Sequence, residues 1–514
     1  MAEISKRWRQ WPFGLALLLA GAVALVVSAF TDTEPSARVP DGDAAVNEGA
    51  ASQGDISANN SPTIARNPRN PGNLAVANRI DGPRYACGLH VSSNGGSRWE
   101  RVPVEIPRGE ERKCYAPDIT FTRDGKLHMT YVTLKGVGNV PNAGWYVSST
   151  DGGRTLSKPR RVLGPLSFQV RLTADPKDPR RLYLSYLRAD SDVGVLKFTA
   201  PGNPLLVAGS RDGGSTWDRP VRVNPVRRAR AVAPSVAVGP RGEVYVLYLD
   251  LGDDRLDYEG EHEGRGGPPY SGEFKLVLAR SLDRGRSWAE SEVEDHLVPT
   301  ERFVAFLPPF PSVAVDPGDG RIYAGFQDGR LGKSDVLVWS RPAGGAAWQG
   351  PTRVNDTPER DGTSQYLPKL AVAPDGRLDV VYYDRRSDPK DVKNEVSLQS
   401  SVDHGESFGA ATTLTGQAFD SSVGYGNERD LPDLGSRLGL VTGESSALAV
   451  WSDTRSGTID SNKQDIGSAR VELEKPGVRI AARHILLYGG AALMLAGLFV
   501  LVGVGLSARA RPAR

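Results

Sequence analysis

The stretch that decides the fold is residues 210–217, which read Ser-Arg-Asp-Gly-Gly-Ser-Thr-Trp. Asp and Ser side chains in such a stretch can hydrogen-bond to the backbone of their own turn, and glycine supplies a positive φ at little steric cost. The closing aromatic ring can lie over neighbouring strands and bury apolar area. The stretch therefore predicts a tight turn between two strands, fixed in place by its tryptophan.

Variants of this turn recur along the chain. The related stretches are residues 92–99, 149–156, 281–288 and 401–408, together with a degenerate copy that ends at Trp348. The copy at 92–99 has Asn94 in place of Asp, and the copy at 149–156 closes with Leu156 instead of an aromatic residue. Several spaced copies of one turn indicate an internal repeat.

Two apolar strands also recur, in most units ahead of such a turn. The first strand begins near a proline, as in Pro234-Ser-Val-Ala-Val-Gly-Pro240, and the second follows a short turn, as in Gly-Glu-Val-Tyr-Val-Leu-Tyr at 242–248. Units of this kind begin at residues 62, 117, 170, 234, 311, 368 and 432. Short strands punctuated by Gly and Pro, with no helical period, predict an all-β repeat.

A unit of four short strands fits one blade of a β-propeller, in which radial closure removes the exposed sheet edges. We therefore expect an all-β propeller over residues 62–474. The seven units favour seven blades, with six blades plus a half-unit as the alternative. Segment 44–53 is a candidate to close the last blade.

The turn pattern S-x-D-x-G-x-[ST]-[WF] resembles the Asp-box (BNR) repeat of the sialidase superfamily. It is nearly intact at Ser149, Ser210, Ser281 and Ser401, and the resemblance covers roughly residues 62–473. It implies a sialidase-like β-propeller that binds or hydrolyses acidic cell-surface glycans, as an exo-sialidase-type glycosidase. The same turn occurs in propellers without enzymatic activity, because fold does not fix function. The alternative is therefore a non-catalytic module that binds glycan or protein, or acts as an envelope scaffold.

Composition excludes several other classes of protein. The 514 residues include 63 basic and 61 acidic ones, and a net charge of +2 argues against a nucleic-acid partner. Two cysteines are too few for a Cys-based zinc or iron–sulfur site, and the six histidines match no zinc-binding spacing. We expect no cofactor and no metal, with Ca²⁺ at the acidic loop 250–263 as the one candidate.

Two uncharged segments, 12–30 and 485–506, are each long enough to span a membrane as a helix. Basic residues in the flanks 1–11 and 507–514 place both ends in the cytoplasm by the positive-inside rule. The propeller then lies on the extracytoplasmic side of the cell membrane, with 31–61 as a polar tether. The first segment is either a retained anchor or a cleaved signal peptide.

Cys87 and Cys114 lie 27 residues apart, and an oxidising compartment favours a disulfide between them. The alternative is a pair of buried free thiols.

Three arginines occupy one topological position, after the second strand of units five, six and seven. They are Arg330, Arg386 and Arg455, each in a D-x-R triplet, and Arg79 ends the second strand of unit one. Guanidinium groups bind carboxylates in a bidentate manner. The resemblance implies an arginine triad that holds the carboxylate of the substrate. In the alternative interpretation, each Asp–Arg pair joins one blade to the next.

The resemblance also implies a tyrosine nucleophile assisted by a glutamate, with an acidic residue as proton donor. Tyr425 and Glu428 are the candidates for the first two roles, and Asp118 or Asp81 for the acid. The Arg-Ile-Pro motif of the superfamily is absent, since the first strand reads Ser-Pro-Thr-Ile at 61–64. In the alternative interpretation Tyr425 packs in the core and Glu428 pairs with a neighbour or faces water.

Overall fold

The computed structural model forms two compact units, the propeller of Ala37–Leu473 and a unit built from the two terminal segments. It describes residues 10–30, 36–52, 54–191, 202–254, 270–300, 309–345, 347–424, 434–474 and 480–509.

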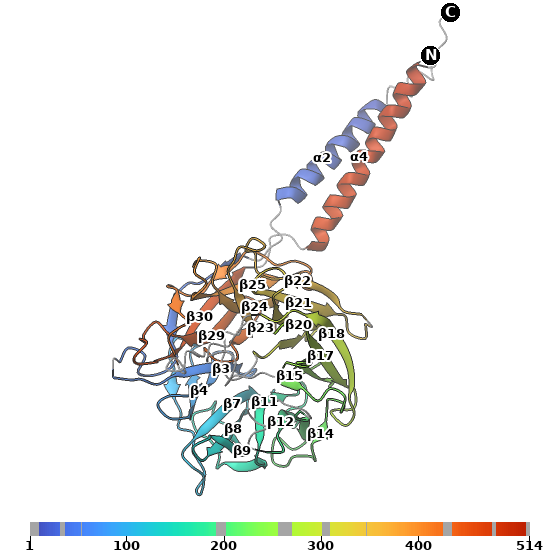
Figure 1. The fold of residues 1–514 in the computed structure, drawn as a ribbon. Coiled ribbons are helices and arrows are strands. Elements are labelled where there is room, and N and C mark those ends of the chain that lie inside the picture. Colours follow the sequence, from blue (N-terminus) through green and yellow to red (C-terminus); the bar gives the residue numbers. More distant parts are fainter. Residues whose placement is uncertain are drawn as a thin grey trace, which may run out of the picture. The chain divides into compact units, whose positions relative to one another are not determined.

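The propeller consists of seven antiparallel sheets arranged around one axis, with the first strand of each blade nearest the axis (Figure 1). Seven blades are thereby confirmed. Blades 1 to 3 are β3 (Asn59–Arg66), β4 (Leu74–Ile80), β5 (Ala86–Ser92) and β6 (Glu100–Arg101); β7 (Cys114–Phe121), β8 (Leu127–Lys135), β9 (Val140–Ser149) and β10 (Arg160–Leu163); and β11 (Ser167–Ala174), β12 (Leu182–Arg188), β13 (Leu205–Ser210) and β14 (Val221–Arg222).

The remaining blades follow the same order. They are β15 (Ala231–Val238), β16 (Val244–Asp250), β17 (Phe274–Ser281) and β18 (Ala289–Leu297); β19 (Ser312–Val315), β20 (Ile322–Asp328), β21 (Asp335–Arg341) and β22 (Gln349–Arg353); β23 (Gln365–Val372), β24 (Leu378–Asp384), β25 (Lys393–Ser401), β26 (Thr412–Thr413) and β27 (Phe419–Asp420); and β28 (Gly439–Thr442), β29 (Ser446–Asp453) and β30 (Asp465–Glu474) with β1 (Ser36–Arg38) and β2 (Asp43–Ala45).

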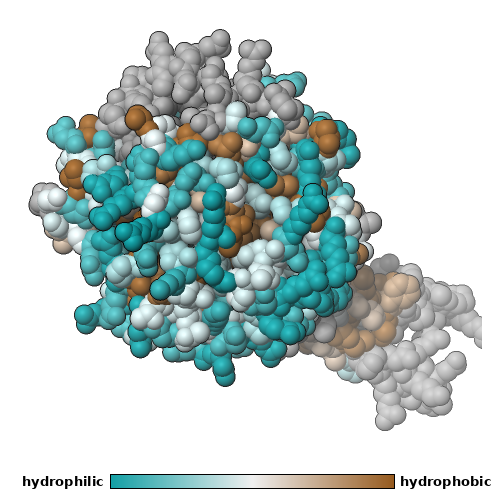
Figure 2. Space-filling model, turned by 90° about the horizontal axis from the view of Figure 1, so that it is seen from below, coloured by the Kyte–Doolittle hydropathy of each residue, from teal (hydrophilic) through white to brown (hydrophobic). Residues whose placement is uncertain are grey.

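Burial follows the position of each strand in its blade. The second strands are the most apolar, and every residue of β20 and of β24 is buried, because both faces of these strands pack against neighbouring blades. The short outer strands are exposed, as in β6. In the view of Figure 2, hydrophilic residues cover most of the propeller surface and apolar residues are scattered over it. The apolar side chains thus lie mainly between the blades.

The turns at 92–99, 149–156, 210–217, 281–288 and 401–408 share one hydrogen-bond pattern. In the turn that begins at Ser210, the serine Oγ donates to Asp212 Oδ1 over 3.0 Å, and the backbone N–H of Gly214 donates to the serine Oγ over 2.9 Å. The N–H of Thr216 donates to Asp212 Oδ1 over 2.8 Å, and the closing Trp217 ring meets Tyr146 of blade 2 edge-on at 5.9 Å. The turn therefore closes its own blade and contacts the preceding one.

The N-terminal segment closes the propeller. β1 and β2 both pair with β30, so the last blade is built from both ends of the propeller unit. The buried Lys463 amine donates to the carbonyl oxygens of Gly49, Ala50 and Ser52 over 2.8–2.9 Å. Closure thus involves residues 36–52, which overlap the expected segment 44–53. Residues 36–60 differ from the expected polar tether, because their backbone pairs with a strand more than 400 residues away in sequence.

The second unit contains α2 (Gln10–Phe30) and α4 (Ile480–Arg509), which include the segments 12–30 and 485–506. The two helices approach closely where both have glycine, since a Cβ on Gly21 would lie 2.6 Å from the carbonyl oxygen of Gly490. Within the part of the chain that the structure describes, no helix is both long and apolar enough to cross a membrane.

Candidate functional site

The three arginines of the D-x-R triplets are each held by carboxylates. In blade 5, Arg330 Nε donates to Asp328 over 2.8 Å, and its Nη2 donates over 2.9 Å to Glu294 of β18 in blade 4. Asp328 is fully buried and also accepts from the N–H of Val298. The arginine therefore joins two neighbouring blades.

The other two triplets have the same arrangement. Arg386 donates to Asp384 and to Asp356, which follows the outer strand of blade 5, both over 2.6 Å. Arg455 binds Asp453 and Asp43, a residue of β2. Each guanidinium thus faces at least two carboxylates. The contacts of Arg330 and Arg386 agree with the interpretation in which the pairs connect blades, whereas Arg455 binds β2 of its own blade, where Asp43 accepts from the N–H of Gly416 in blade 6. Substrate binding by these arginines stays a prediction.

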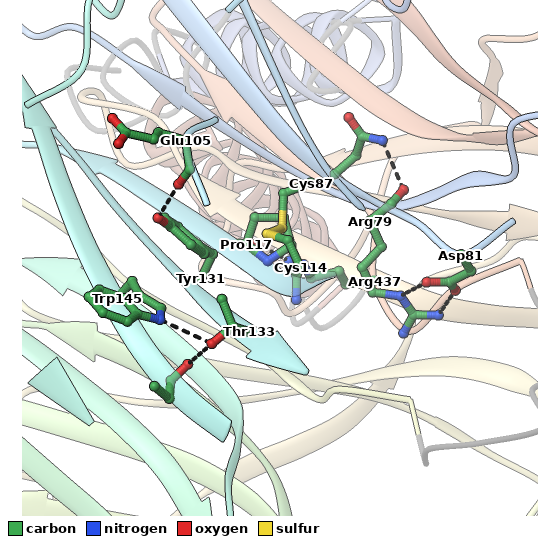
Figure 3. The surroundings of a disulfide bond; sticks show 12 residues. Arg79, Asp81, Cys87, Glu105, Cys114, Pro117, Tyr131, Thr133, Trp145 and Arg437 are labelled. Atoms are coloured by element: carbon green, nitrogen blue, oxygen red, sulfur yellow. Dashed lines mark hydrogen bonds and ion pairs between the residues drawn. A yellow bond between two sulfur atoms is a disulfide. The ribbon is translucent and has the colours of Figure 1, made fainter. Parts of the chain in front are cut away.

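Of the other candidates, Arg79 forms a buried ion pair with Asp81 (Figure 3). Its Nη1 also donates to Tyr115 Oη over 2.9 Å. Tyr425 and Glu428 lie outside the described residues. Most of the acidic loop 250–263 also lies outside them, and among the residues that are described no group of three possible ligands could hold a metal ion. The remaining candidate, Asp118, lies near the axis of the propeller.

A bulge is repeated on the first strands of the blades. The ladder between the first and second strand shifts register at this bulge in blades 1, 2, 3, 4 and 6. In these blades one residue of the bulge has a positive φ between 49° and 57°, and in blade 7 Gly435, four residues ahead of β28, has a φ of 93°. These residues are Ser61, Ala116, Gln169, Ala233, Leu367 and Gly435. A strained conformation that recurs around one axis is a reason to look for function there.

In blades 1 to 6, an equivalent residue of the first strand opens the run of four paired residues next to the turn. In blade 7 the ladder gives this place to Gly439, and Arg437 lies two residues ahead of it. We call the six equivalent residues together with Arg437 the channel ring: Thr63, Asp118, Arg171, Ser235, Ser312, Lys369 and Arg437. Three hydroxyls, three cations and one carboxylate therefore belong to this set. Sequence reasoning selected only Asp118 from this set.

Contacts within the channel ring connect blades that are not all neighbours. Asp118 Oδ1 lies 3.4 Å from Arg171 Nη1, and its Oδ2 accepts from the N–H of Leu172 over 2.8 Å. Arg437 reaches from blade 7 to blade 2, where its Nη2 donates over 2.6 Å to the carbonyl oxygen of Pro117 (both labelled in Figure 3). The side chains of the channel ring therefore extend towards one another across the axis.

The cations of the channel ring act on one another electrostatically. Burial lowers the pKa of the Lys369 amine to about 8; Arg171 and Arg437 also lower this pKa, whereas Asp118 raises it. Burial is also the main cause of a lowered pKa for the Arg437 guanidinium, and Arg171 adds to that shift. Three cations face one carboxylate, which gives a net charge of +2. As whole residues, Lys369 and Arg171 are half-buried, and the Arg171 side chain is 13% exposed.

Phe310 covers one side of the cluster. The guanidinium of Arg171 lies over the Phe310 ring at 5.6 Å from its centroid. The backbone N–H of Phe310 donates to the carbonyl oxygen of Ser436 over 3.1 Å. An aromatic ring over a guanidinium stabilises the cation and orients it. The arrangement can thus hold an anion, with the Thr63 hydroxyl of the channel ring to bind a neutral oxygen.

A sequence signal for the channel ring does exist. In six of the seven units, the ring residue follows directly after the residue with which the unit begins, which is a proline in five of the six. This signal consists of a single residue in each unit, and the sequence alone does not show that these residues lie close together in the fold. In the last unit, where Pro432 marks the expected start, Arg437 comes five residues later and the ladder opens at Gly439.

Cys87 and Cys114 are joined by a disulfide, which connects β5 of blade 1 to β7 of blade 2 (Figure 3). The bond lies at the start of the strand that also carries Tyr115 and Asp118. A cavity of about 500 Å³ borders it, lined among others by Arg101 and by Arg112. None of the channel-ring residues lines this cavity.

No family model and no curated protein matches the chain. Similar solved structures include a protein of unknown function from Dyadobacter fermentans, 14% identical with a TM-score of 0.47 over 85% of this chain and 99% of the other. A Hadza microbial sialidase is 14% identical, with a TM-score of 0.41 over 80% and 75%. An α-L-arabinofuranosidase of Fusarium graminearum is 15% identical, with a TM-score of 0.44 over 72% and 97%. The propeller thus has structural neighbours in the sialidase and arabinofuranosidase propeller families.

Proposed function

We propose that the protein is an extracytoplasmic propeller, held at the cell membrane by its terminal helices, that binds acidic glycans at the channel ring. The observation that carries the proposal is the net positive charge of the ring, in a position where two of the cations are partly exposed. Buried charges are usually paired, so a cluster whose described charges do not cancel is a candidate for ligand binding. The Thr63 hydroxyl, which has no hydrogen-bond partner among the described residues, suits a neutral oxygen of a sugar. Ser235 and Ser312 are already bonded to the backbone of Pro311 and Leu370.

Hydrolysis of the exo-sialidase type is the catalytic form of this proposal. Asp118 would supply the acid, and Tyr425 with Glu428 the nucleophile. The contacts of Asp118 favour the alternative, a binding module without catalysis, because both of its oxygens already face Arg171 or a backbone N–H.

Membrane anchoring rests on the full apolar runs of the sequence, 12–30 and 485–506. It is supported by apolar side chains that the two-helix unit leaves exposed, such as Leu19 (60%) and Phe499 (85%). We expect the full chain to stay with membranes under alkaline extraction. The control is a chain truncated after residue 478 that keeps the first segment. Its release by the same treatment would show that the C-terminal helix is needed to hold the protein at the membrane.

The binding proposal is tested with the full chain in detergent. Sialylated and uronate-containing oligosaccharides are titrated into the wild type and into the Lys369→Met and Arg330→Gln variants, and hydrolysis of a fluorogenic sialoside is measured in parallel. We expect Lys369→Met to weaken binding while its thermal unfolding is unchanged or raised. Arg330→Gln is expected to lower thermal stability and keep binding.

Three outcomes are distinguished by this experiment. Binding with hydrolysis supports the sialidase form, and binding without hydrolysis supports the module. Binding that is lost in Arg330→Gln and kept in Lys369→Met would overturn the channel ring as the site and favour the D-x-R loops.

A further inference from the structure

The channel ring contains more hydrogen-bond donors than the described part of the protein satisfies. Buried atoms without a hydrogen-bond partner there include Arg437 Nε and Thr63 Oγ1, together with the two atoms of the 3.4 Å ion pair, Arg171 Nη1 and Asp118 Oδ1. The Lys369 amine likewise has no hydrogen bond to any described residue. Arg437 is only 7% exposed. Since buried donors are nearly always paired in native proteins, Arg437 Nε and the Lys369 amine lack acceptor oxygens among the described residues.

Among the described residues, the charges around the ring do not cancel. Arg171, Lys369 and Arg437 contribute three positive charges, and Asp118 returns one. The adjacent pair of Arg79 and Asp81 is neutral by itself. A single carboxylate would leave one cation unbalanced, whereas a group with two negative charges would balance the ring.

We infer that the group held by the channel ring is a phosphate monoester, carried by a sugar or a glycan. This inference rests on the proposed function, since it specifies the charged group of the ligand. A phosphate monoester has a charge of about −1.5 to −2 near pH 7 and three strong acceptor oxygens. Guanidinium groups bind it in a bidentate manner and a lysine amine binds it as a point charge. Lys369 and Arg171 are half-buried and Arg437 is buried, so the phosphate would first meet Lys369 and Arg171.

The pH dependence follows from the groups around the Lys369 amine, which are Arg171 on β11, Asp118 on β7 and Arg437 ahead of β28. A phosphate monoester gains its second charge above about pH 6. The Lys369 amine loses its charge as the pH rises through about 8. Affinity should therefore rise between pH 5 and 7 and fall above pH 8.

The experiment is calorimetric titration of the full chain in detergent at constant ionic strength, with glucose 6-phosphate, inorganic phosphate, glucuronate and glucose as probes. We expect glucose 6-phosphate to bind at least about tenfold more tightly than glucuronate, and glucose not to bind. Tighter binding of glucose 6-phosphate than of inorganic phosphate identifies a sugar-borne group. Equal affinities would overturn that part of the inference and identify free phosphate as the ligand.

Substitutions at Lys369 provide the matched controls. Lys369→Met should weaken phosphate binding at least about tenfold at pH 7, whereas Lys158→Met, at an exposed lysine, should leave it unchanged. Lys369→Arg keeps the charge at all pH values, and should therefore retain binding above pH 8.

Failure of the inference is distinguishable from failure of the proposed function. If uronate-containing oligosaccharides bind and phosphate neither binds nor competes, the phosphate inference is wrong and the glycan proposal stands. If no anion binds to a folded chain, both are wrong. If the fall of phosphate affinity above pH 8 disappears in Lys158→Met as well as in Lys369→Arg, the role of Lys369 is also contradicted.

Discussion

Arg330 and Lys369 are both cations near carboxylates, but they differ in how fully they are paired, and we therefore assign them different roles. Arg330 is neutralised by the buried Asp328 and by Glu294, so it connects blades. Lys369 has no such partner among the described residues and shares its surroundings with two further cations. A cation that is fully paired contributes to stability, whereas one that lacks a partner is available to a ligand.

Removal of Arg330 should therefore be costly for folding. Arg330→Gln leaves the buried Asp328 carboxylate without its cation, and we expect a loss of about 2 kcal/mol in the free energy of unfolding. Chemical denaturation measures this change. Arg286→Gln, at an exposed arginine whose side chain has no described contact, should cost less than about 0.5 kcal/mol. Equal losses in the two variants would contradict the account of the D-x-R pairs.

Two buried histidines should make stability depend on pH. Burial lowers the pKa of His90 to about 4 and that of His128 to about 3, below the value near 6.5 of the unfolded chain. The contribution of the two neutral histidines to the free energy of unfolding is therefore complete above about pH 6.5. It is lost as the pH falls, because at first only the unfolded chain takes up protons. We expect a loss of about 4 kcal/mol between pH 7 and 5. Denaturation curves at the two pH values test this, and unchanged midpoints would contradict it.

At the scale of elements, the Asp-box turn is defined by geometry more than by charge. In blade 1, Asn94 replaces the aspartate and makes the same contacts, since its Oδ1 accepts from Ser92 Oγ over 2.9 Å and from the N–H of Arg98 over 3.0 Å. An amide oxygen thus suffices for the turn.

Substitutions at Asp212 test this interpretation. Asp212→Asn should change the free energy of unfolding by less than about 0.5 kcal/mol, while Asp212→Ala should cost about 1 kcal/mol because the turn loses its acceptor. Thermal unfolding of both variants provides the comparison. Similar losses in both would show that the carboxylate charge itself stabilises the turn.

Elements could be predicted from the sequence where their pattern is local. The apolar alternation of the second strands and the turns at 210–217 and its relatives locate most strands and the number of blades. The strands β1 and β2 could not be recognised, because each has three residues and pairs only with the distant β30. The channel ring was missed because a bulge reverses which residue of a strand faces the axis, and periodicity alone does not reveal a bulge.

At the scale of the whole molecule, the propeller depends on its N-terminal closure. Lys463 connects β30 to residues 49–52 through three carbonyl oxygens, and its side chain is 3% exposed. Lys463→Met should lower the free energy of unfolding by about 2 kcal/mol, because it removes the three hydrogen bonds that hold residues 49–52 to β30. Limited proteolysis should then cut first within residues 36–52. Cutting that begins elsewhere would contradict the role of this segment in closure.

The most direct test of the central claim is a crystal structure of the full chain grown with glucose 6-phosphate. The account predicts a phosphate group within hydrogen-bond distance of Lys369 Nζ and Arg437 Nε, with the sugar near the hydroxyls of the channel ring. A ring that holds only water, with the anion bound at Arg330, Arg386 or Arg455 instead, would contradict it.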